Sequence, residues 1–199
     1  MKSVAGIILL AFGLSSFALI NGGYKVGDTV NDFMLKNIDG KSVSLSSFKN
    51  NKGLIVIFDC NTCPVSNAYN SRIIALSKKY QNTFPLIAIN SNDPEQSPGD
   101  SFEEMISNAK HKEYNFPYLV DETQAVAKSF GATNTPHVFV LNKSDNTYKV
   151  TYIGAIDDNA RNASVASKKY VEQAVDALLE GKPVTVEKTK AVGCGIKWK

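Results

Sequence analysis

The sequence of 199 residues has little of what builds metal centres and disulfide-stapled domains: three cysteines, two histidines and one tryptophan. Small secreted domains held by disulfides usually carry an even set of cysteines, so this count does not indicate such a framework. The net charge is only +3 and no dense lysine or arginine run occurs, so no nucleic-acid partner is expected. With 43% hydrophobic and 21% charged residues, the chain has the composition of a globular protein with its own core.

The N-terminus has the parts of a secretory signal peptide. Lys2 precedes an apolar run over residues 4–14, and small residues follow. We therefore expect residues 1–22 to be a signal peptide, and the folded part to be exported to the periplasm or another extracytoplasmic space. The charge-free stretch through Ile20 approaches the length that spans a bilayer, so an uncleaved anchor is the alternative. Membrane contact is expected only in that case.

The rest of the sequence predicts alternating strands and helices. Short apolar runs rich in β-branched residues predict strands at 54–58, 84–89, 116–120, 137–141 and 148–153. Apolar residues at helical spacing predict helices at 64–80, 101–111, 121–130 and 165–179. An Asp39-Gly40 turn between apolar runs predicts an N-terminal β-hairpin. This order predicts one α/β domain over residues 23–183, with a tail over residues 184–199 that packs on it.

Cys60 and Cys63 lie where the buried strand at 54–58 meets the helix that begins at Pro64. A helix N-terminus offers unpaired N–H groups and a partial positive charge, which stabilise a thiolate and lower its pKa. The Cys-x-x-Cys spacing in this context predicts a pair that cycles between dithiol and disulfide. We expect Cys60, as the more exposed sulfur, to attack a disulfide and Cys63 to resolve the mixed disulfide.

Two other uses of this pair stay open from the residues alone. Half of a zinc site would need further ligands, for which Cys194, His111 and His137 are available. A static disulfide would leave the pair without chemistry. Because no second close cysteine pair exists and a strand-to-helix junction suits reactive sulfur, we favour redox chemistry that needs neither a metal nor an organic cofactor.

Four segments carry a family resemblance: residues 60–64, 88–94, 135–137 and 193–199. Together they resemble the redoxin branch of the thioredoxin-like superfamily, and more narrowly the alkyl hydroperoxide reductase and thiol-specific antioxidant (AhpC/TSA) proteins. The resemblance implies a thioredoxin-like three-layer α/β/α sandwich with an N-terminal hairpin extension. It also implies a cis peptide bond between Thr135 and Pro136, where the exposed backbone of Thr135 would bind an extended substrate segment. His137 is expected to pack in the following strand and not to act as a base.

Two departures from the relatives bear on the reaction. Peroxiredoxins carry a Pro-x-x-x-Thr-x-x-Cys pattern; aligned on Cys63, the Thr position holds Cys60 and the Pro position holds Val56. The loss of that hydroxyl and ring favours disulfide exchange over peroxide reduction. Thioredoxins carry a buried aspartate in the preceding strand, whereas here the strand is wholly apolar and the nearest acid is Asp59.

These observations predict an exported thiol–disulfide oxidoreductase. Its partners would be protein or small-molecule disulfides and thiols, with electrons supplied by an upstream dithiol protein. A thiol-dependent peroxidase with an antioxidant role and a non-catalytic thioredoxin-fold binding module are the alternatives. Cys194 has two interpretations: the tail folds back so that Cys194 is a third redox cysteine, or it is an isolated thiol.

Overall fold

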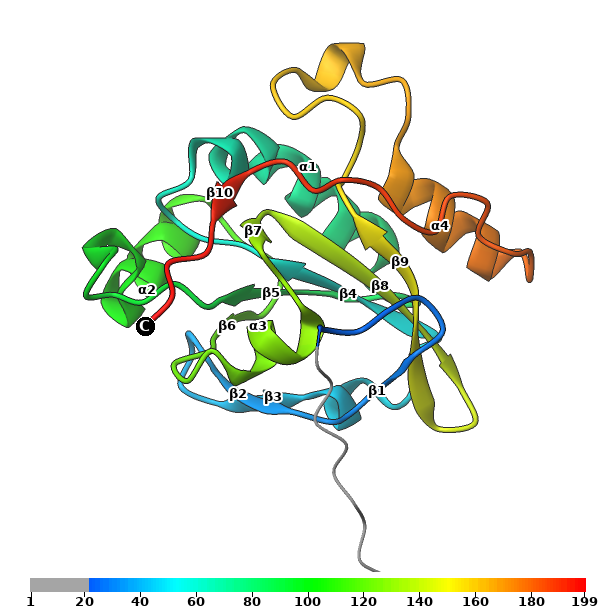
Figure 1. The fold of residues 1–199 in the computed structure, drawn as a ribbon, viewed down its shortest axis with the longest axis horizontal. Helices are drawn as coiled ribbons and strands as arrows, with labels where there is room; N and C mark the ends of the chain where they lie inside the picture. Colours follow the sequence, from blue (N-terminus) through cyan, green and yellow to red (C-terminus); the bar gives the residue numbers. More distant parts are fainter. Residues whose placement is uncertain (1–21) are drawn as a thin grey trace, which may run out of the picture.

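The computed structural model describes residues 22–199, so the predicted signal peptide, apart from its last residue, lies outside the described residues. Within residues 22–199, no helix has the length and apolar character needed to cross a bilayer. Helices cover both faces of a central sheet (Figure 1). They are α1 (Pro64–Tyr80), α2 (Phe102–His111), α3 (Ala125–Phe130) and α4 (Tyr170–Leu179).

The central sheet of the described chain has eight strands in the order β1-β9-β8-β4-β5-β6-β2-β3. Their bounds are β1 (Thr29–Val30), β2 (Met34–Asn37), β3 (Ser42–Ser44), β4 (Gly53–Phe58), β5 (Leu86–Asn90), β6 (Tyr118–Val120), β8 (His137–Ser144) and β9 (Thr147–Gly154). β4 runs parallel to β5 and antiparallel to β8, and β2 pairs antiparallel with β3. A separate two-stranded sheet joins β7 (Asn134–Thr135) to β10 (Cys194–Gly195).

β4 is the centre of the sheet, and every residue in it is buried. A strand with neighbours on both edges and helices on both faces has no polar side, which explains its continuous apolar sequence. The first residue of the strand is Gly53. A larger residue would not fit there, because a Cβ would lie 2.0 Å from the Phe84 ring. The strand ends at Phe58, so the chain that follows emerges at the carboxyl edge of the sheet, directly before α1.

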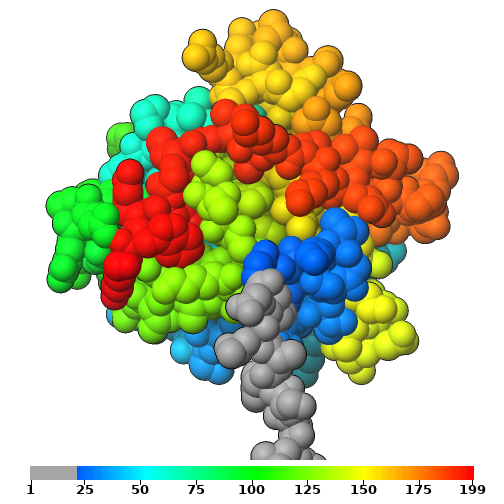
Figure 2. All heavy atoms as spheres, in the orientation of Figure 1, coloured from blue at the N-terminus to red at the C-terminus, as the bar shows by residue number. Residues whose placement is uncertain are grey.

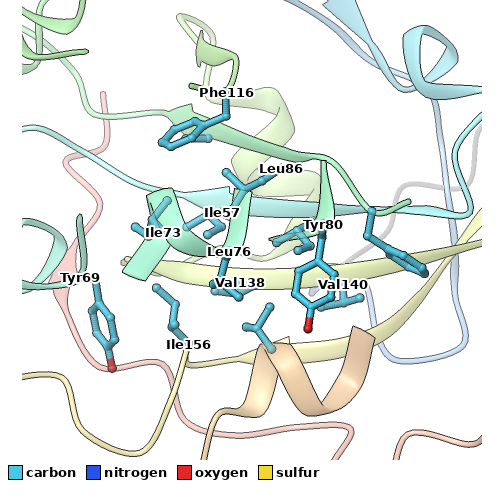
Figure 3. Close-up of a cluster of buried hydrophobic side chains, with 14 of the residues drawn as sticks. Ile57, Tyr69, Ile73, Leu76, Tyr80, Leu86, Phe116, Val138, Val140 and Ile156 are labelled. Carbon is cyan, nitrogen blue, oxygen red and sulfur yellow. The ribbon is translucent and has the colours of Figure 1, made fainter. Parts of the chain in front are cut away.

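The two faces of the sheet carry separate apolar layers. On one face, α1, α2 and α4 pack against the sheet, and Figure 3 shows Ile73 and Leu76 of α1 with Ile57 and Val138 of the sheet. On the other face lie α3, the N-terminal segment and the end of the tail, which contributes Ile196. The sheet therefore forms the middle of three layers, and both its apolar faces are covered.

Two predicted helices begin later than their apolar spacing indicates. α3 begins at Ala125 instead of residue 121, because the Asp121 carboxylate accepts the N–H of Ala127 at 2.8 Å and makes the preceding residues a turn. α4 begins at Tyr170 instead of residue 165. There the Asp158 carboxylate accepts both the N–H and the hydroxyl of Ser167, at 2.9 and 2.6 Å, and ties that segment into a loop.

Candidate active site

Cys60 and Cys63 both lie at the carboxyl edge of β4, and neither is bonded to another cysteine. Cys63 is the N-cap residue of α1, with Pro64 in the first turn. Exposure does not separate the two cysteines: Cys60 is 2% exposed and Cys63 is 1% exposed. The tail pairs with Thr135 through β10 and covers the start of α1, so both sulfurs are enclosed.

Thr135 contacts both sulfurs. Its hydroxyl Oγ1 lies 3.0 Å from Sγ of Cys60, and its carbonyl oxygen accepts a hydrogen bond from the Cys63 thiol at 3.2 Å. The Thr135–Pro136 peptide bond is cis. The structure therefore brings together four of the predicted site residues, from β4's edge, the start of α1 and the loop before β8.

The surroundings favour ionisation of Cys63 over that of Cys60. The Cys60 thiol beside it lowers the pKa of Cys63 below its ordinary value; Cys194 and the Ser66 N–H at the start of α1 add to this effect, against the opposing effect of burial. Cys60 has the reverse setting, because the adjacent Cys63 sulfur and burial raise its pKa well above the ordinary value, and the Asp100 carboxylate adds to this. A helix N-terminus favours the anion on Cys63, and neighbouring carboxylates disfavour it on Cys60.

Asp59 is buried next to Cys60 and is 1% exposed. Within residues 22–199, neither of its carboxylate oxygens has a hydrogen-bond partner. Burial raises the pKa of Asp59 to about 6, with a partial offset from Ser66, the Cys60 N–H and the Lys112 cation. An acid with this pKa exchanges its proton near neutral pH, and unpartnered buried carboxylates are rare outside functional sites.

Asp100 holds the Asn61-Thr62 connection from the other side. Its carboxylate accepts the Asn61 N–H and the Thr62 hydroxyl, both at 2.7 Å, and the Ser97 hydroxyl at 2.6 Å. Burial opposes ionisation of Asp100, but these bonds and that from the Asn92 amide outweigh it and lower its pKa. Sequence reasoning missed this residue, although the density of Asn, Asp and Ser over residues 90–100 was a visible signal.

The C-terminal tail covers the sulfurs. Cys194 and Gly195 in β10 pair antiparallel with Thr135 and Asn134 in β7. Figure 2 shows the tail, in red, lying across one face of the molecule beside the yellow-green segment that holds β7. The expectation that the Thr135 backbone is exposed for a substrate is therefore wrong: Thr135 is 1% exposed, because the chain's own tail occupies that edge.

The remaining candidates from the sequence lie outside the sulfur cluster. His137 begins β8, packs on Phe139 in a tilted arrangement with 4.8 Å between ring centroids, and accepts the Thr133 N–H on Nδ1 at 3.4 Å. Burial, together with the nearby Lys188 cation, lowers the pKa of His137 to about 4, so it is neutral at physiological pH. In the described part of the chain, no group of three or more His, Cys, Asp or Glu residues is arranged to hold a metal ion.

The chain matches a known protein family. The family model described as "AhpC/TSA family" matches residues 26–159. The chain belongs to the AhpC/TSA family. The match covers the sheet, α1 and the loop before β8, and it ends before α4 and the tail. No curated protein matches the chain significantly.

Solved structures share the fold over nearly the whole described chain. An uncharacterized conserved protein from Geobacillus kaustophilus is 37% identical, with a TM-score of 0.81, covering 88% of this chain and 93% of its own. A hypothetical protein from Sinorhizobium meliloti 1021 is 32% identical, with a TM-score of 0.81, covering 89% and 96%. The pneumococcal exposed lipoprotein thioredoxin from Streptococcus pneumoniae, 20% identical with a TM-score of 0.56, covers 76% and 99%. The fold is thioredoxin-like.

Proposed function

We propose that this protein is an exported thiol–disulfide oxidoreductase whose dithiol/disulfide pair is Cys60 and Cys63. The observation that carries the proposal is the meeting of two free sulfurs at the start of α1, both in contact with Thr135. Their surroundings lower the pKa of Cys63 and raise that of Cys60. This gives one sulfur ready to attack and one ready to resolve, with roles opposite to those that the spacing alone suggests.

The reaction follows from these roles. The Cys63 thiolate attacks one sulfur of a substrate disulfide, whose S–S bond breaks; the leaving thiolate takes up a proton. Cys60 then gives up its proton and attacks Sγ of Cys63, which releases the second substrate thiol and leaves a Cys60–Cys63 disulfide. Asp59, buried beside Cys60 and without a hydrogen-bond partner among the described residues, accepts the Cys60 proton in this proposal. An upstream dithiol protein reduces the disulfide and is itself oxidised.

Export rests on the pattern of residues 1–22, where a basic residue, an apolar run and small residues follow one another. Expression of the full chain in a bacterial host, followed by fractionation and mass measurement, tests it. We expect a protein shortened by about 20 residues in the extracytoplasmic fraction. A full-length protein in the cytoplasm would contradict export, and a full-length protein in the membrane fraction would show an uncleaved anchor.

One preparation assayed for two activities tests the function itself. We expect the protein to accelerate reduction of insulin disulfides by dithiothreitol, and expect both Cys60→Ser and Cys63→Ser to abolish this acceleration. The Cys63 variant also removes the thiol that reacts with iodoacetamide at pH 5, because Cys60 stays protonated there. Hydrogen peroxide consumption without insulin reduction would overturn the proposal.

A thiol peroxidase is the second candidate. One observation favours it: the stabilised Cys63 thiolate lies in an enclosed site that a small oxidant enters more easily than a protein does. Against it, the positions of the peroxidase proline and threonine hold Val56 and Cys60. If neither activity appears and the Cys60–Cys63 disulfide has a very low reduction potential, the pair is a staple in a binding module.

A further inference from the structure

The C-terminal tail lies where a bound peptide strand would lie, and it carries a cysteine. Cys194 is in register with Thr135, the residue that contacts both Cys60 and Cys63. Gly193 allows this approach, because a Cβ there would lie 2.0 Å from the Thr135 carbonyl oxygen. The Cys194 thiol lowers the pKa of Cys63. Two sulfurs therefore contact Thr135, and a third cysteine is its partner in the β7–β10 ladder.

The tail is anchored by polar contacts to the buried Gln124 and to Asn92. Gln124, 1% exposed, donates from Nε2 to the Lys197 carbonyl at 2.8 Å and accepts the Lys199 N–H on Oε1 at 2.9 Å. Asn92 accepts the Lys197 N–H at 2.9 Å. Gln124 has a φ of 61°, an unfavourable backbone conformation for a glutamine, and both polar atoms of its side chain serve the tail. Ile196 is buried in the core.

The three sulfurs differ in access to solvent. Cys60 and Cys63 are enclosed, whereas Cys194 is only partly buried. A protein thiol or a glutathione-sized thiol approaching the closed site therefore meets Sγ of Cys194 first. A disulfide between Cys63 and Cys194 would bring the oxidising equivalent of the buried pair to an accessible sulfur.

We propose that Cys194 is the third redox cysteine of this protein: the tail acts as a built-in substrate strand, and exchange with outside thiols and disulfides passes through a Cys63–Cys194 disulfide. This inference rests on the proposed redox activity of Cys60 and Cys63. It adds the route by which partners reach that buried pair. It also assigns the tail beyond residue 159, which the family model does not match, a part in the reaction.

The steps balance without a further oxidant. Starting from the Cys60–Cys63 disulfide, the Cys194 thiol loses its proton and attacks Sγ of Cys63. The Cys60–Cys63 bond breaks, and Cys60 leaves and takes up a proton. An outside thiolate then attacks Sγ of Cys194, and Cys63, the sulfur with the lowest pKa, leaves as thiolate. A second outside thiol attacks the outside sulfur of the mixed disulfide, so that the two outside thiols become linked by a disulfide and Cys194 is released as a thiol. The same steps in reverse pass electrons from the protein to an outside disulfide.

Trapping tests the bond itself. The Cys60→Ser variant keeps Cys63 and Cys194, and we expect oxidised glutathione to convert it to an intramolecular Cys63–Cys194 disulfide, identified by peptide mass mapping. The matched Cys63→Ser variant keeps Cys60 and Cys194, and we expect no intramolecular bond, because the Cys60 sulfur faces the Thr135 hydroxyl. A Cys60→Ser variant that carries only glutathione on Cys63 would overturn the inference.

Kinetics separates this inference from the function on which it rests. Cys194→Ser keeps the Cys60–Cys63 disulfide, but we expect its reduction by glutathione to slow by at least about tenfold, because both sulfurs stay enclosed. Val192→Ser, at an exposed tail position, is the control and keeps the wild-type rate. Reduction of Cys194→Ser at the wild-type rate would overturn the role of Cys194 and leave the proposed function standing. A wild-type protein that never forms the Cys60–Cys63 disulfide would overturn the proposed function instead.

Discussion

Two buried aspartates flank the Cys-x-x-Cys segment, and their surroundings are opposite. Asp100 accepts five hydrogen bonds, from Asn61, Thr62, Asn90, Asn92 and Ser97, and its pKa is lowered. Asp59 accepts none within the described chain, and burial raises its pKa to about 6. Both are nearly inaccessible to solvent, so burial alone does not explain the difference. The number of donors aimed at each carboxylate does.

This difference separates two tasks at one site. A carboxylate saturated with donors is fixed in its charged form, and it holds the segment between the cysteines in place. A carboxylate without donors is costly to ionise, so its charge changes within the range where thiols react. Asp100 is therefore a positioning residue. Asp59 is the group whose protonation can follow the chemistry of Cys60.

The largest effect is expected from Asp100→Ala. The variant leaves buried donors on Asn61, Thr62 and Ser97 unpaired, so the free energy of unfolding should fall by about 4 kcal/mol. Urea unfolding of the reduced protein at pH 7 measures it. Asp100→Asn keeps the shape and part of the acceptor capacity, and should lose less. A loss below about 1 kcal/mol for Asp100→Ala would show that the hydrogen bonds to Asp100 do not stabilise the fold.

Asp59→Asn should raise the free energy of unfolding, by an amount that depends on pH. Because the pKa of Asp59 in the folded state is raised from 3.8 to about 6, the folded state binds this proton more tightly than the unfolded state. Wild-type stability therefore falls as the pH rises from 3.8 to about 6, and this loss persists above it. The variant lacks the loss and should be more stable at pH 8 by on the order of 3 kcal/mol.

The difference between the two proteins isolates Asp59 from other titrating groups. Urea unfolding of wild type and Asp59→Asn at a series of pH values gives the difference directly, and its pH-dependent part should disappear below about pH 3, where Asp59 is neutral in both the folded and the unfolded state. A difference independent of pH would mean that Asp59 does not carry the raised pKa. If Asp59 also takes the Cys60 proton, the variant resolves mixed disulfides more slowly although it is more stable.

Much of this arrangement follows from local patterns in the sequence. The continuous apolar run of β4 predicts a buried central strand, and Pro64 after Cys63 predicts the helix start. Both are local signals, since a strand's burial and a helix's first turn depend on neighbouring residues. The thioredoxin-like fold follows from the order of such elements together with the resemblance of the motifs, and the structural comparison confirms it.

What the sequence does not reveal depends on contacts between distant segments. Asp100 meets Asn61 across 39 positions, and Cys194 meets Thr135 across 59. No periodicity predicts such pairs. The enclosure of both Cys60 and Cys63 is also beyond local patterns, because the tail that covers them is the last segment of the chain. The polar composition of residues 90–100 is typical of a loop, but it does not indicate which side chains face the cysteines.

The smallest effect is expected from Lys112→Met. The Lys112 cation lowers the pKa of Asp59, and burial lowers the pKa of Lys112 itself, so each group depends on the other's charge. Removing the cation should raise the pKa of Asp59 further, through a coupling below about 1 kcal/mol because Lys112 is partly solvated. Carboxyl NMR titration of Asp59 measures it, with Lys110→Met, an exposed lysine in the last turn of α2 just before Lys112, as the control. If both variants shift the pKa of Asp59 equally, the net charge of the protein, and not the Asp59–Lys112 pair, affects that pKa. The contrast between Asp59 and Asp100 then rests on hydrogen bonding alone.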